Sequence, residues 1–184
     1  MSSEVKLCLL KTDDLIDSFL QSFNRYQETK HVYVYNGRNL TLQQEEFTDE
    51  WDEAKKRQIV AHLRETVKSG GAVISARQNG RVIGFSVIEP EFFGEEDAYL
   101  ELSYLHISAD NRGQGIGEQL FKKTLQTAKE IGAIKLYIGA HPAVETQEFY
   151  KKMGCIPAKE INRIIYKREP RDIQLEVTCN EIQP

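Results

Sequence analysis

The pattern of apolar and polar positions changes its character three times within residues 99–131. In residues 99–108, leucine, aromatic and β-branched side chains dominate, which predicts a buried strand. In residues 116–131, apolar side chains recur at helical spacing and lysine and glutamine take the opposite face, which predicts an amphipathic helix. Asp110, Asn111, Arg112 and three glycines interrupt both patterns between them. The chain therefore predicts a strand, a glycine-rich turn and a helix in direct succession.

Two further helices are predicted before residue 72. Residues 5–10 form a first strand, and Thr12 is a suitable cap for a helix after it. Thr48 is a suitable cap for the second helix, in which acidic residues precede basic ones as the helix dipole favours, and residues 69–71 end it. The predicted apolar faces are Leu15, Ile16, Phe19, Leu20 and Phe23 in the first helix, and Trp51, Ala54, Ile59, Leu63 and Val67 in the second. His62 flanks the second face and is interpreted as a structural residue.

Residues 30–42 have the least regular pattern. Asn36-Gly37 is a hairpin turn signal, and the residues before it favour an extended conformation. Tyr33 and Tyr35 either line a substrate pocket or belong to a covering ribbon that partly buries them, and we favour the ribbon. The sequence does not assign a role to residues 30–47.

The remaining segments predict a mixed sheet. Residues 72–77 and 82–88 form a hairpin around Asn79-Gly80, and residues 134–139 form a later strand. Pro142 opens a short helix that runs to Met153. Residues 155–161 and 172–178 are expected to be extended, and residues 162–171 show no clear pattern. We therefore expect one α/β domain (α+β by some schemes) over residues 1–184, with helices on both faces of the sheet.

Composition and charge exclude several functional classes. The chain has 184 residues, 40% of them hydrophobic, and a net charge of −4 from 24 basic and 28 acidic side chains. A nucleic-acid partner is not expected, because it would require a basic excess. No apolar run approaches the roughly 20 residues of a membrane span, and the first residues do not have the pattern of a signal peptide. The cysteines at positions 8, 155 and 179 are odd in number and lack metal-ligand spacing, so a cytoplasmic protein without a metal is expected.

The glycine-rich turn has the chemistry of a phosphate-binding loop. The first N–H groups of a helix lack partners, and the positive end of the helix dipole lies behind them. Gly113, Gly115 and Gly117 allow a bulky anion to approach the backbone, and Arg112 adds a positive charge. Glu118 excludes both a P-loop, which requires Gly-Lys-Ser/Thr, and the dinucleotide fingerprint, which requires a small residue there.

The phrase Arg-x-x-Gly-x-Gly at residues 112–117 resembles the acetyl-CoA pyrophosphate loop of the GNAT superfamily of N-acetyltransferases. The order of elements is similar over nearly the whole chain, although the specific motifs cover only residues 99–154. The resemblance implies a mixed, mostly antiparallel sheet flanked by helices, and acetyl-CoA as co-substrate in a cleft beside the central strand. It also implies that the following residues bind acetyl-CoA: Leu105, His106, Ile107, Arg112, Gly113, Gln114, Gly115, Ile116 and Gly117.

Glu101 is the candidate general base. A carboxylate in the middle of an apolar strand is costly unless it is paired or functional. It lies six residues before Ile107, where the resemblance implies a glutamate base in some members of the superfamily. The alternative is a glutamate that is solvated or paired with a lysine. Glu89, at the end of the adjacent strand, is the reserve candidate.

Tyr150 is the candidate general acid. Phe149, Tyr150 and Gly154 match a phrase that is similar to Phe-Tyr-x-x-x-Gly-Phe in GNAT enzymes, where the tyrosine hydroxyl faces the sulfur of coenzyme A. Cys155 replaces the usual phenylalanine, and Ala143 stands where an asparagine often opens the helix. A packed tyrosine with a hydrated hydroxyl is the alternative. Neither Cys155 as a nucleophile nor His106 as a proton carrier is favoured over a buried structural role.

The resemblance implies transfer of an acetyl group from acetyl-CoA to a primary amine by direct attack in a ternary complex. A non-catalytic acyl-CoA-binding sensor is the main alternative. A nucleotide-binding Rossmann protein is disfavoured, because this sequence lacks the acidic residue that binds the ribose in such proteins. The sequence does not identify the acceptor amine among small molecules, peptides and proteins. An exposed sheet edge near the C-terminus would allow a homodimer.

Overall fold

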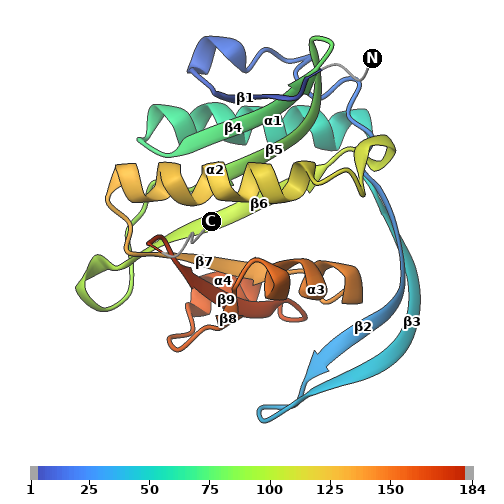
Figure 1. Cartoon of the computed structure of the whole chain (residues 1–184), viewed down its shortest axis with the longest axis vertical. Helices are drawn as coiled ribbons and strands as arrows, with labels where there is room; N and C mark the ends of the chain where they lie inside the picture. The colour runs from blue at the N-terminus through green and yellow to red at the C-terminus, as the bar shows by residue number, and fades with distance from the viewer. Residues whose placement is uncertain (1–3, 181–184) are drawn as a thin grey trace.

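The computed structural model describes residues 4–180, which contain one seven-stranded sheet in the order β1-β4-β5-β6-β7-β9-β8 (Figure 1). Every neighbouring pair is antiparallel except β6 and β7, which are parallel. The predicted mixed, mostly antiparallel sheet is therefore confirmed. The strands are β1 (Lys6–Leu9), β4 (Ala72–Gln78), β5 (Arg81–Ile88), β6 (Tyr99–Ile107), β7 (Lys135–Ala140), β8 (Ile156–Pro157) and β9 (Ile173–Thr178).

Helices cover both faces of this sheet (Figure 1). The apolar side of α2 (Ile116–Ile131) packs on the face that Ala72 and Ile74 share, together with α3 (Val144–Lys152). The apolar side of α1 (Glu53–Lys68) packs on the opposite face, against Val73. Alternate residues of β4 therefore serve two separate cores, as the period of two along a strand requires. The predicted strand, turn and helix over residues 99–131 are confirmed.

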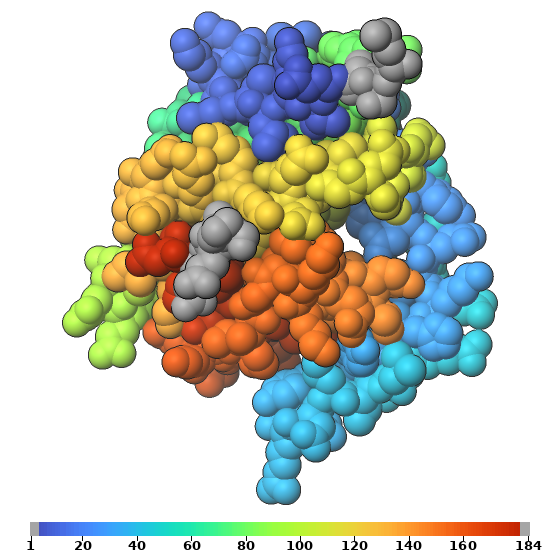
Figure 2. Space-filling view, in the orientation of Figure 1, coloured from blue at the N-terminus to red at the C-terminus, as the bar shows by residue number. Residues whose placement is uncertain are grey.

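A long hairpin, β2 (Tyr26–Tyr35) and β3 (Leu40–Glu50), forms a separate two-stranded sheet. It curves along one side of the molecule, and its tip projects beyond the other elements (Figures 1 and 2). The backbone N–H of Tyr33 donates to the carbonyl of Pro142 at 2.9 Å, which fixes the hairpin beside α3. The turn at Asn36-Gly37 is confirmed, and the favoured ribbon interpretation fits Tyr33, which is half-buried, but not Tyr35, which is 57% exposed.

The predicted helix after Thr12 is wrong. Only a short 3-10 turn, η1 (Thr12–Asp14), forms there, and turns follow it. The side chain of Arg64 in α1 donates to the carbonyl of Leu15 at 2.6 Å, so that carbonyl is not available for a regular helical bond. Four of the five predicted apolar residues are buried nonetheless, whereas Ile16 is 60% exposed.

The predicted start of the second helix at Thr48 is also wrong. Strand β3 continues to Glu50, and the N-cap of α1 is Asp52, whose Oδ1 accepts from the N–H of Lys55 at 2.7 Å. Trp51 therefore precedes the helix, and its indole packs against Phe85 and His106. An aspartate cap competes well with threonine, and the antiparallel pairing with β2 extends the strand past Thr48.

The C-terminal part differs from expectation in one element. Of the predicted extended segment 155–161, only Ile156–Pro157 pairs as a strand, so that prediction is mostly wrong. Residues 162–171 contain α4 (Arg163–Arg168), capped by Asn162, whose Oδ1 accepts from two backbone N–H groups at 3.0 and 3.1 Å. Among residues 4–180, no helix combines the length and the apolar character that crossing a bilayer requires.

Candidate active site

The cleft arises where β6 separates from β7. The parallel pairing covers only Tyr99, Leu100 and Glu101 of β6, and the strands are not paired beyond this point. On its other edge β6 pairs with β5 through a bulge at Ser103, because Leu102 pairs with Ile88 and the next paired residue of β6 is Tyr104. A cleft of about 1230 Å³ lies along the separated segment, lined by residues of β6, β7, α2, α3, α4 and the β2–β3 hairpin. This volume exceeds that of most single-ligand pockets and suits two substrates.

One end of the cleft is formed by the glycine-rich turn. Gly113 and Gly115 have φ angles of +74° and +76°, and a Cβ atom added to either would meet nothing within 4 Å. Gly115 caps α2 without any side-chain hydrogen bond, so the first N–H groups of the helix face open space. Arg112 stands beside them, with its Nε donating to the carbonyl of Ile107 at 3.2 Å. These features fit a pyrophosphate; Gln114, by contrast, is exposed and outside the cleft lining.

The predicted pantetheine-binding segment of β6 lines the cleft. Leu105 and Ile107 pack toward the core under α2, whereas the ring of His106 faces the aromatic residues of the opposite side. The ring centroids of His106 and Trp51 are 5.0 Å apart. Burial, with help from the nearby charges of Arg25 and Arg112, lowers the pKa of His106 well below its usual range. His106 is therefore neutral, which supports the structural role expected from the sequence.

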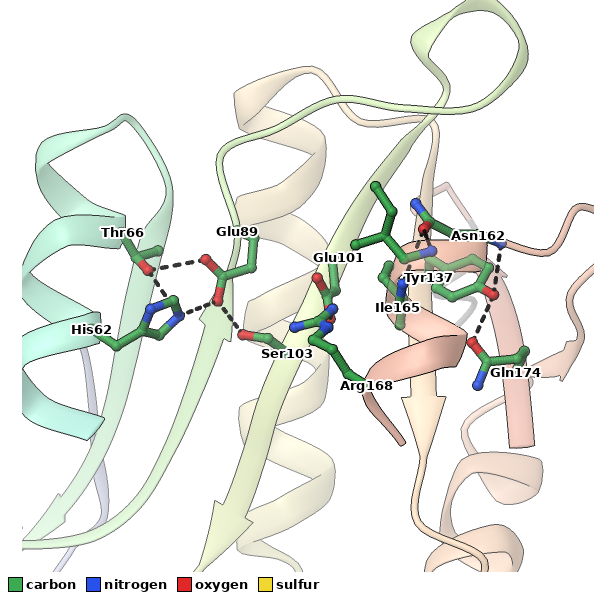
Figure 3. Close-up of polar contacts among 11 residues, drawn as sticks. His62, Thr66, Glu89, Glu101, Ser103, Tyr137, Asn162, Ile165, Arg168 and Gln174 are labelled. Atoms are coloured by element: carbon green, nitrogen blue, oxygen red, sulfur yellow. Dashed lines mark hydrogen bonds and ion pairs between the residues drawn. The ribbon is translucent and has the colours of Figure 1, made fainter. Parts of the chain in front are cut away.

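Glu101 faces the cleft from the base of β6. Its side chain is only 14% exposed, and Oε1 accepts from Nη2 of Arg168 in α4 at 2.5 Å (Figure 3). Burial raises the pKa of Glu101, while Arg168 opposes this rise. The paired alternative to a catalytic role is thus present, with an arginine in place of the expected lysine.

Glu89, the reserve candidate, is held by three polar side chains (Figure 3). His62 lies 2.7 Å from Oε1, the hydroxyl of Ser103 donates to the same oxygen at 2.5 Å, and the hydroxyl of Thr66 donates to Oε2 at 3.0 Å. This network ties the end of β5 to α1 and to the bulge in β6. A carboxylate with so many partners is better suited to holding the bulge than to taking a proton.

Tyr150 faces the cleft from α3. It is 6% exposed and packs against Phe121 and Phe149, and the start of α2 approaches closely because Gly117 has no side chain to meet Phe149. Burial is the main reason that its pKa is raised, so its hydroxyl keeps its proton and is able to donate it. Burial also raises the pKa of the Cys155 thiol to about 12, which disfavours a thiolate nucleophile there.

Sequence reasoning missed several residues on the side of the cleft away from the glycine-rich turn. Asp172, directly before β9, lines the cleft, and burial is the largest cause that raises its pKa to about 7. Glu169 and Asp49 add to this rise, and Arg171 opposes it. The absence of a side chain at Gly139 leaves the space beside Asp172 open, since a Cβ there would lie 3.8 Å from Oδ2. The only sequence signal for the orientation of Asp172 is the alternation of side chains between the two faces of the predicted strand at residues 172–178.

No cluster of three or more histidine, cysteine, aspartate or glutamate side chains able to hold a metal occurs in the part of the chain that the structure describes.

Comparison with known proteins points to one family. A family model described as the acetyltransferase (GNAT) family matches residues 37–155. An uncharacterized N-acetyltransferase from Mycobacterium tuberculosis (strain H37Rv) is 31% identical over 84 residues, which is 45% of this chain and 51% of that protein. A protein of Mycobacterium bovis with the same description matches equally. The chain thus spans about half the length of the curated relatives it matches.

Solved structures share the fold over almost the whole chain. A putative streptothricin acetyltransferase from Bacillus anthracis in complex with acetyl coenzyme A has a TM-score of 0.72 at 17% identity, covering 95% of this chain and 98% of that one. A nourseothricin acetyltransferase has a TM-score of 0.66 at 16% identity with the same coverage. The ribosomal-protein-S18-alanine N-acetyltransferase of Escherichia coli has a TM-score of 0.59 at 14% identity, covering 98% and 97%. At these identities the likeness shows the fold.

Proposed function

We propose that this chain, which belongs to the acetyltransferase (GNAT) family, transfers the acetyl group of acetyl-CoA to a primary amine by direct attack in a ternary complex. The observation that carries the proposal is the division of one cleft into two unlike halves. The half at residues 112–117 presents backbone N–H groups and an arginine, whereas the other half presents carboxylates and aromatic rings, with arginines beside the carboxylates. The first half suits the phosphates of acetyl-CoA, and the second suits a cationic amine.

In this proposal acetyl-CoA lies along the segment of β6 that has separated from β7. Its pyrophosphate contacts the start of α2, and its pantetheine arm contacts the backbone of residues 105–107, which lacks a β7 partner. The thioester carbonyl is polarised by a backbone N–H of the same segment, as an oxyanion-binding donor would act. The cofactor supplies the activated acyl group, and the residues of the chain position it.

The acceptor must lose a proton before it attacks. An alkyl ammonium with a pKa of ~10.4 requires about 4.6 kcal/mol to become neutral at pH 7. Glu101 is the proposed base, because burial raises the pKa of its carboxyl toward the range useful for catalysis. Its contact with Arg168, which is 53% exposed, must open or be exchanged for the incoming ammonium. Removal of that guanidinium would raise the pKa of Glu101 further and strengthen it as a base.

The leaving thiolate is protonated in the last step. Tyr150 is the proposed acid, because its side chain lines the cleft and its hydroxyl is protonated at neutral pH. Burial raises the pKa of this hydroxyl and so weakens it as an acid, which means that the proton transfer depends on a direct hydrogen bond to the developing thiolate. The nitrogen–carbon bond forms, the carbon–sulfur bond breaks, the amine proton passes to Glu101, and the sulfur receives a proton from Tyr150.

The experiment combines a cofactor measurement with an acceptor panel. The purified protein is titrated with acetyl-CoA, then incubated with acetyl-CoA and amines, with free thiol as the rate signal and product mass as confirmation. The panel includes streptothricin and nourseothricin, because two structural neighbours carry these names. We expect acceptor-dependent thiol release that falls about 100-fold in Glu101→Gln and at least tenfold in Tyr150→Phe, with acetyl-CoA binding preserved.

The alternative function, a non-catalytic acyl-CoA-binding sensor, predicts binding without acceptor-dependent release. Failure to bind acetyl-CoA at all would contradict both functions. Full activity in both variants would leave the family assignment intact and refute the proposed roles of Glu101 and Tyr150.

A further inference from the structure

The inner face of the β2–β3 hairpin lines the acceptor half of the cleft. Gln27 pairs with Asp49, and the carbonyl of Arg25 accepts from the N–H of Trp51 at 3.2 Å. Paired residues and residues two apart share one face of an antiparallel ribbon, so these four side chains point the same way. All four line the cleft. The hairpin region thus contributes one wall of the cleft, formed by Arg25, Gln27, Asp49 and Trp51, which no sequence motif predicted.

This wall contains an unusual concentration of unpaired polar atoms. Among residues 4–180, six buried side-chain nitrogen and oxygen atoms lack a hydrogen-bond partner. Four of them belong to the hairpin region: Nε and Nη1 of Arg25, Oγ1 of Thr29 and Oδ2 of Asp49. Buried polar groups are normally satisfied, because each unpaired group costs about 1–3 kcal/mol. Three of these four atoms, on Arg25 and Asp49, belong to residues that line the cleft, whereas Thr29 does not line it. The three atoms indicate a place where a ligand supplies the missing partners.

Arg25 is the most informative member of this group. It is only 6% exposed, and its guanidinium lies 5.5 Å from the ring centroid of Trp51. The charges that face it are the carboxylate of Asp49 and the guanidinium of Arg112, and neither forms a hydrogen bond with it. His106 beside it is neutral. A buried cation with unpaired N–H groups is costly, so an anionic or carbonyl oxygen that binds in the space next to it would stabilise it.

Asp49 presents the complementary requirement. Its Oδ2 is buried and lies 3.3 Å from Nε2 of His141, which carries the ring proton because Nδ1 accepts from the N–H of Ala143. This contact is poorly aligned for a hydrogen bond, and the Asp49 side chain as a whole is 39% exposed. Oδ2 of Asp49 is therefore able to accept from a better-aligned N–H donor, whereas the buried guanidinium of Arg25 needs an oxygen. A phosphate would be repelled by Asp49, whereas a planar carboxylate next to an N–H group satisfies both side chains.

We infer that Arg25 and Asp49 form a subsite for the carboxylate end of the acceptor, so that the acceptor is a carboxylate-bearing amine of the amino acid or peptide class. Arg25 donates to the carboxylate, and Asp49 accepts from the neighbouring N–H group. This inference rests on the proposed function, because it assigns the acceptor of the same cleft. It narrows the acceptor to molecules that carry a negative charge beside a nitrogen.

The test uses pairs of amines that differ only by the carboxylate: lysine with cadaverine, and ornithine with putrescine. Binding of each is measured by calorimetry on the acetyl-CoA-free protein, and acetyl transfer is measured separately. We expect the carboxylate-bearing member of at least one pair to bind at least about tenfold more tightly, and the preference to disappear in Arg25→Gln. Arg25→Lys should restore part of it, because a cation remains. Lys30→Gln removes an exposed charge from β2, the strand that follows Arg25, and should leave the preference unchanged.

Several outcomes would overturn the inference. One is equal or tighter binding of the decarboxylated amine in both pairs, and another is a preference that persists in Arg25→Gln. A wild-type protein that binds neither amino acid also overturns it. Because Arg25 is buried, the folded state of each variant is checked by acetyl-CoA binding, and Arg25→Met provides an independent measurement. Removal of an unpaired buried cation should raise the Tm of the ligand-free protein, whereas an arginine that is satisfied within the fold would give a lower Tm.

These outcomes are distinct from failure of the proposed function. The proposed function fails if acetyl-CoA does not bind or no amine accelerates thiol release. The inference alone fails if amines without a carboxylate are acetylated as readily as their carboxylated partners.

Discussion

At one end of the cleft, ten consecutive residues, 108–117, form the turn that we propose binds the phosphates of acetyl-CoA, and the groups they offer are mostly backbone N–H groups. At the other end, the wall is assembled from β3, α1, the start of β6 and α4, and the groups it offers are side chains. Contacts between these elements join distant parts of the sequence: Glu101 and Arg168 are 67 residues apart, and Glu45 and Arg171 are 126 apart.

The two ends differ in how their polar groups are satisfied. The turn leaves N–H groups open because left-handed glycines hold them there, so this end is ready for an anion without rearrangement. The acceptor wall instead contains charges that are occupied by one another, as in Glu101 with Arg168, or left unpaired, as in Arg25. In the proposed function, one end would therefore bind acetyl-CoA through fixed backbone geometry, and the other would exchange ion pairs for contacts with the acceptor. A single substitution in the turn should therefore change the affinity for acetyl-CoA strongly and the affinity for the acceptor weakly.

The largest effect is expected from Gly115→Asp. The new carboxylate would stand where the pyrophosphate binds, and acetyl-CoA affinity should fall at least about 100-fold, equivalent to about 2.7 kcal/mol. Gly80→Asp is the matched control, because Gly80 has a φ of +78° and equally open surroundings at the tip of the β4–β5 hairpin. Both variants carry the same backbone strain, so equal acetyl-CoA affinities by calorimetry would refute the phosphate-binding role of the turn.

The second prediction concerns the loss of folding stability that the buried carboxyl of Asp172 causes at neutral pH. The carboxyl of Asp172 has a pKa of about 7 in the folded protein, against 3.8 for an ordinary aspartate. The folded state therefore binds more protons than the unfolded state between these values, and stability falls as the pH rises from about 4 to about 7. Asp172→Asn removes this loss, so its stability relative to the wild type should grow by roughly 2 kcal/mol between pH 5 and pH 8.

Urea unfolding at the two pH values measures this difference. Asp13→Asn, a change at an exposed aspartate, should have the same small effect at both. A relative stability of Asp172→Asn that stays constant with pH would show that the Asp172 carboxyl is not destabilised in the folded state.

The same contrast explains which parts of the molecule were predictable from the sequence. Strand β6, the turn and α2 are determined by neighbouring residues, so hydrophobic periodicity and three glycines were sufficient to place them. The helix after Thr12 failed because a partner 49 residues away, Arg64, takes the carbonyl of Leu15. The start of α1 was misplaced because pairing with β2 extends β3 beyond Thr48.

The candidate site divides along the same line. Except for Gln114, the predicted residues of the turn line the cleft, as do Glu101 and Tyr150, and all of these were identified through a motif and its spacing. Arg25, Asp49 and Asp172 belong to no local motif, and they share the cleft only because the hairpin and β9 fold against it. Arg168 was missed for a related reason. It belongs to α4, and a helix of six residues with mixed polarity is too short for the helical repeat of apolar residues to be recognised.

The third prediction is made for Arg168→Met, which breaks the ion pair on Glu101. Arg168 lowers the pKa of Glu101, so its loss should raise that pKa and move the acidic limb of the kcat/KM profile to higher pH. Lys167→Met removes an exposed charge from the same helix and should leave the limb in place. A profile that does not move in Arg168→Met would argue that Glu101 is not the base that the profile reports.

The smallest effect is expected where the hairpin meets the C-terminal part of the acceptor wall. Nη2 of Arg171 lies 2.7 Å from Oε2 of Glu45, and its guanidinium lies 5.5 Å from the ring centroid of Phe47. Both charged groups are substantially exposed, so Arg171→Gln should cost only about 0.5 kcal/mol. Because that energy holds the hairpin against the wall, the loss should appear as about twofold faster amide exchange in β3 near Phe47, with the exchange of β6 unchanged.

Arg38→Gln at the exposed tip of the hairpin removes the same charge without this contact and should not alter exchange near Phe47. Equal exchange in Arg171→Gln and the wild type would mean that the wall is held by the backbone contact at Pro142 and by apolar packing, and that its ion pairs are free to be exchanged for an acceptor without loosening the hairpin.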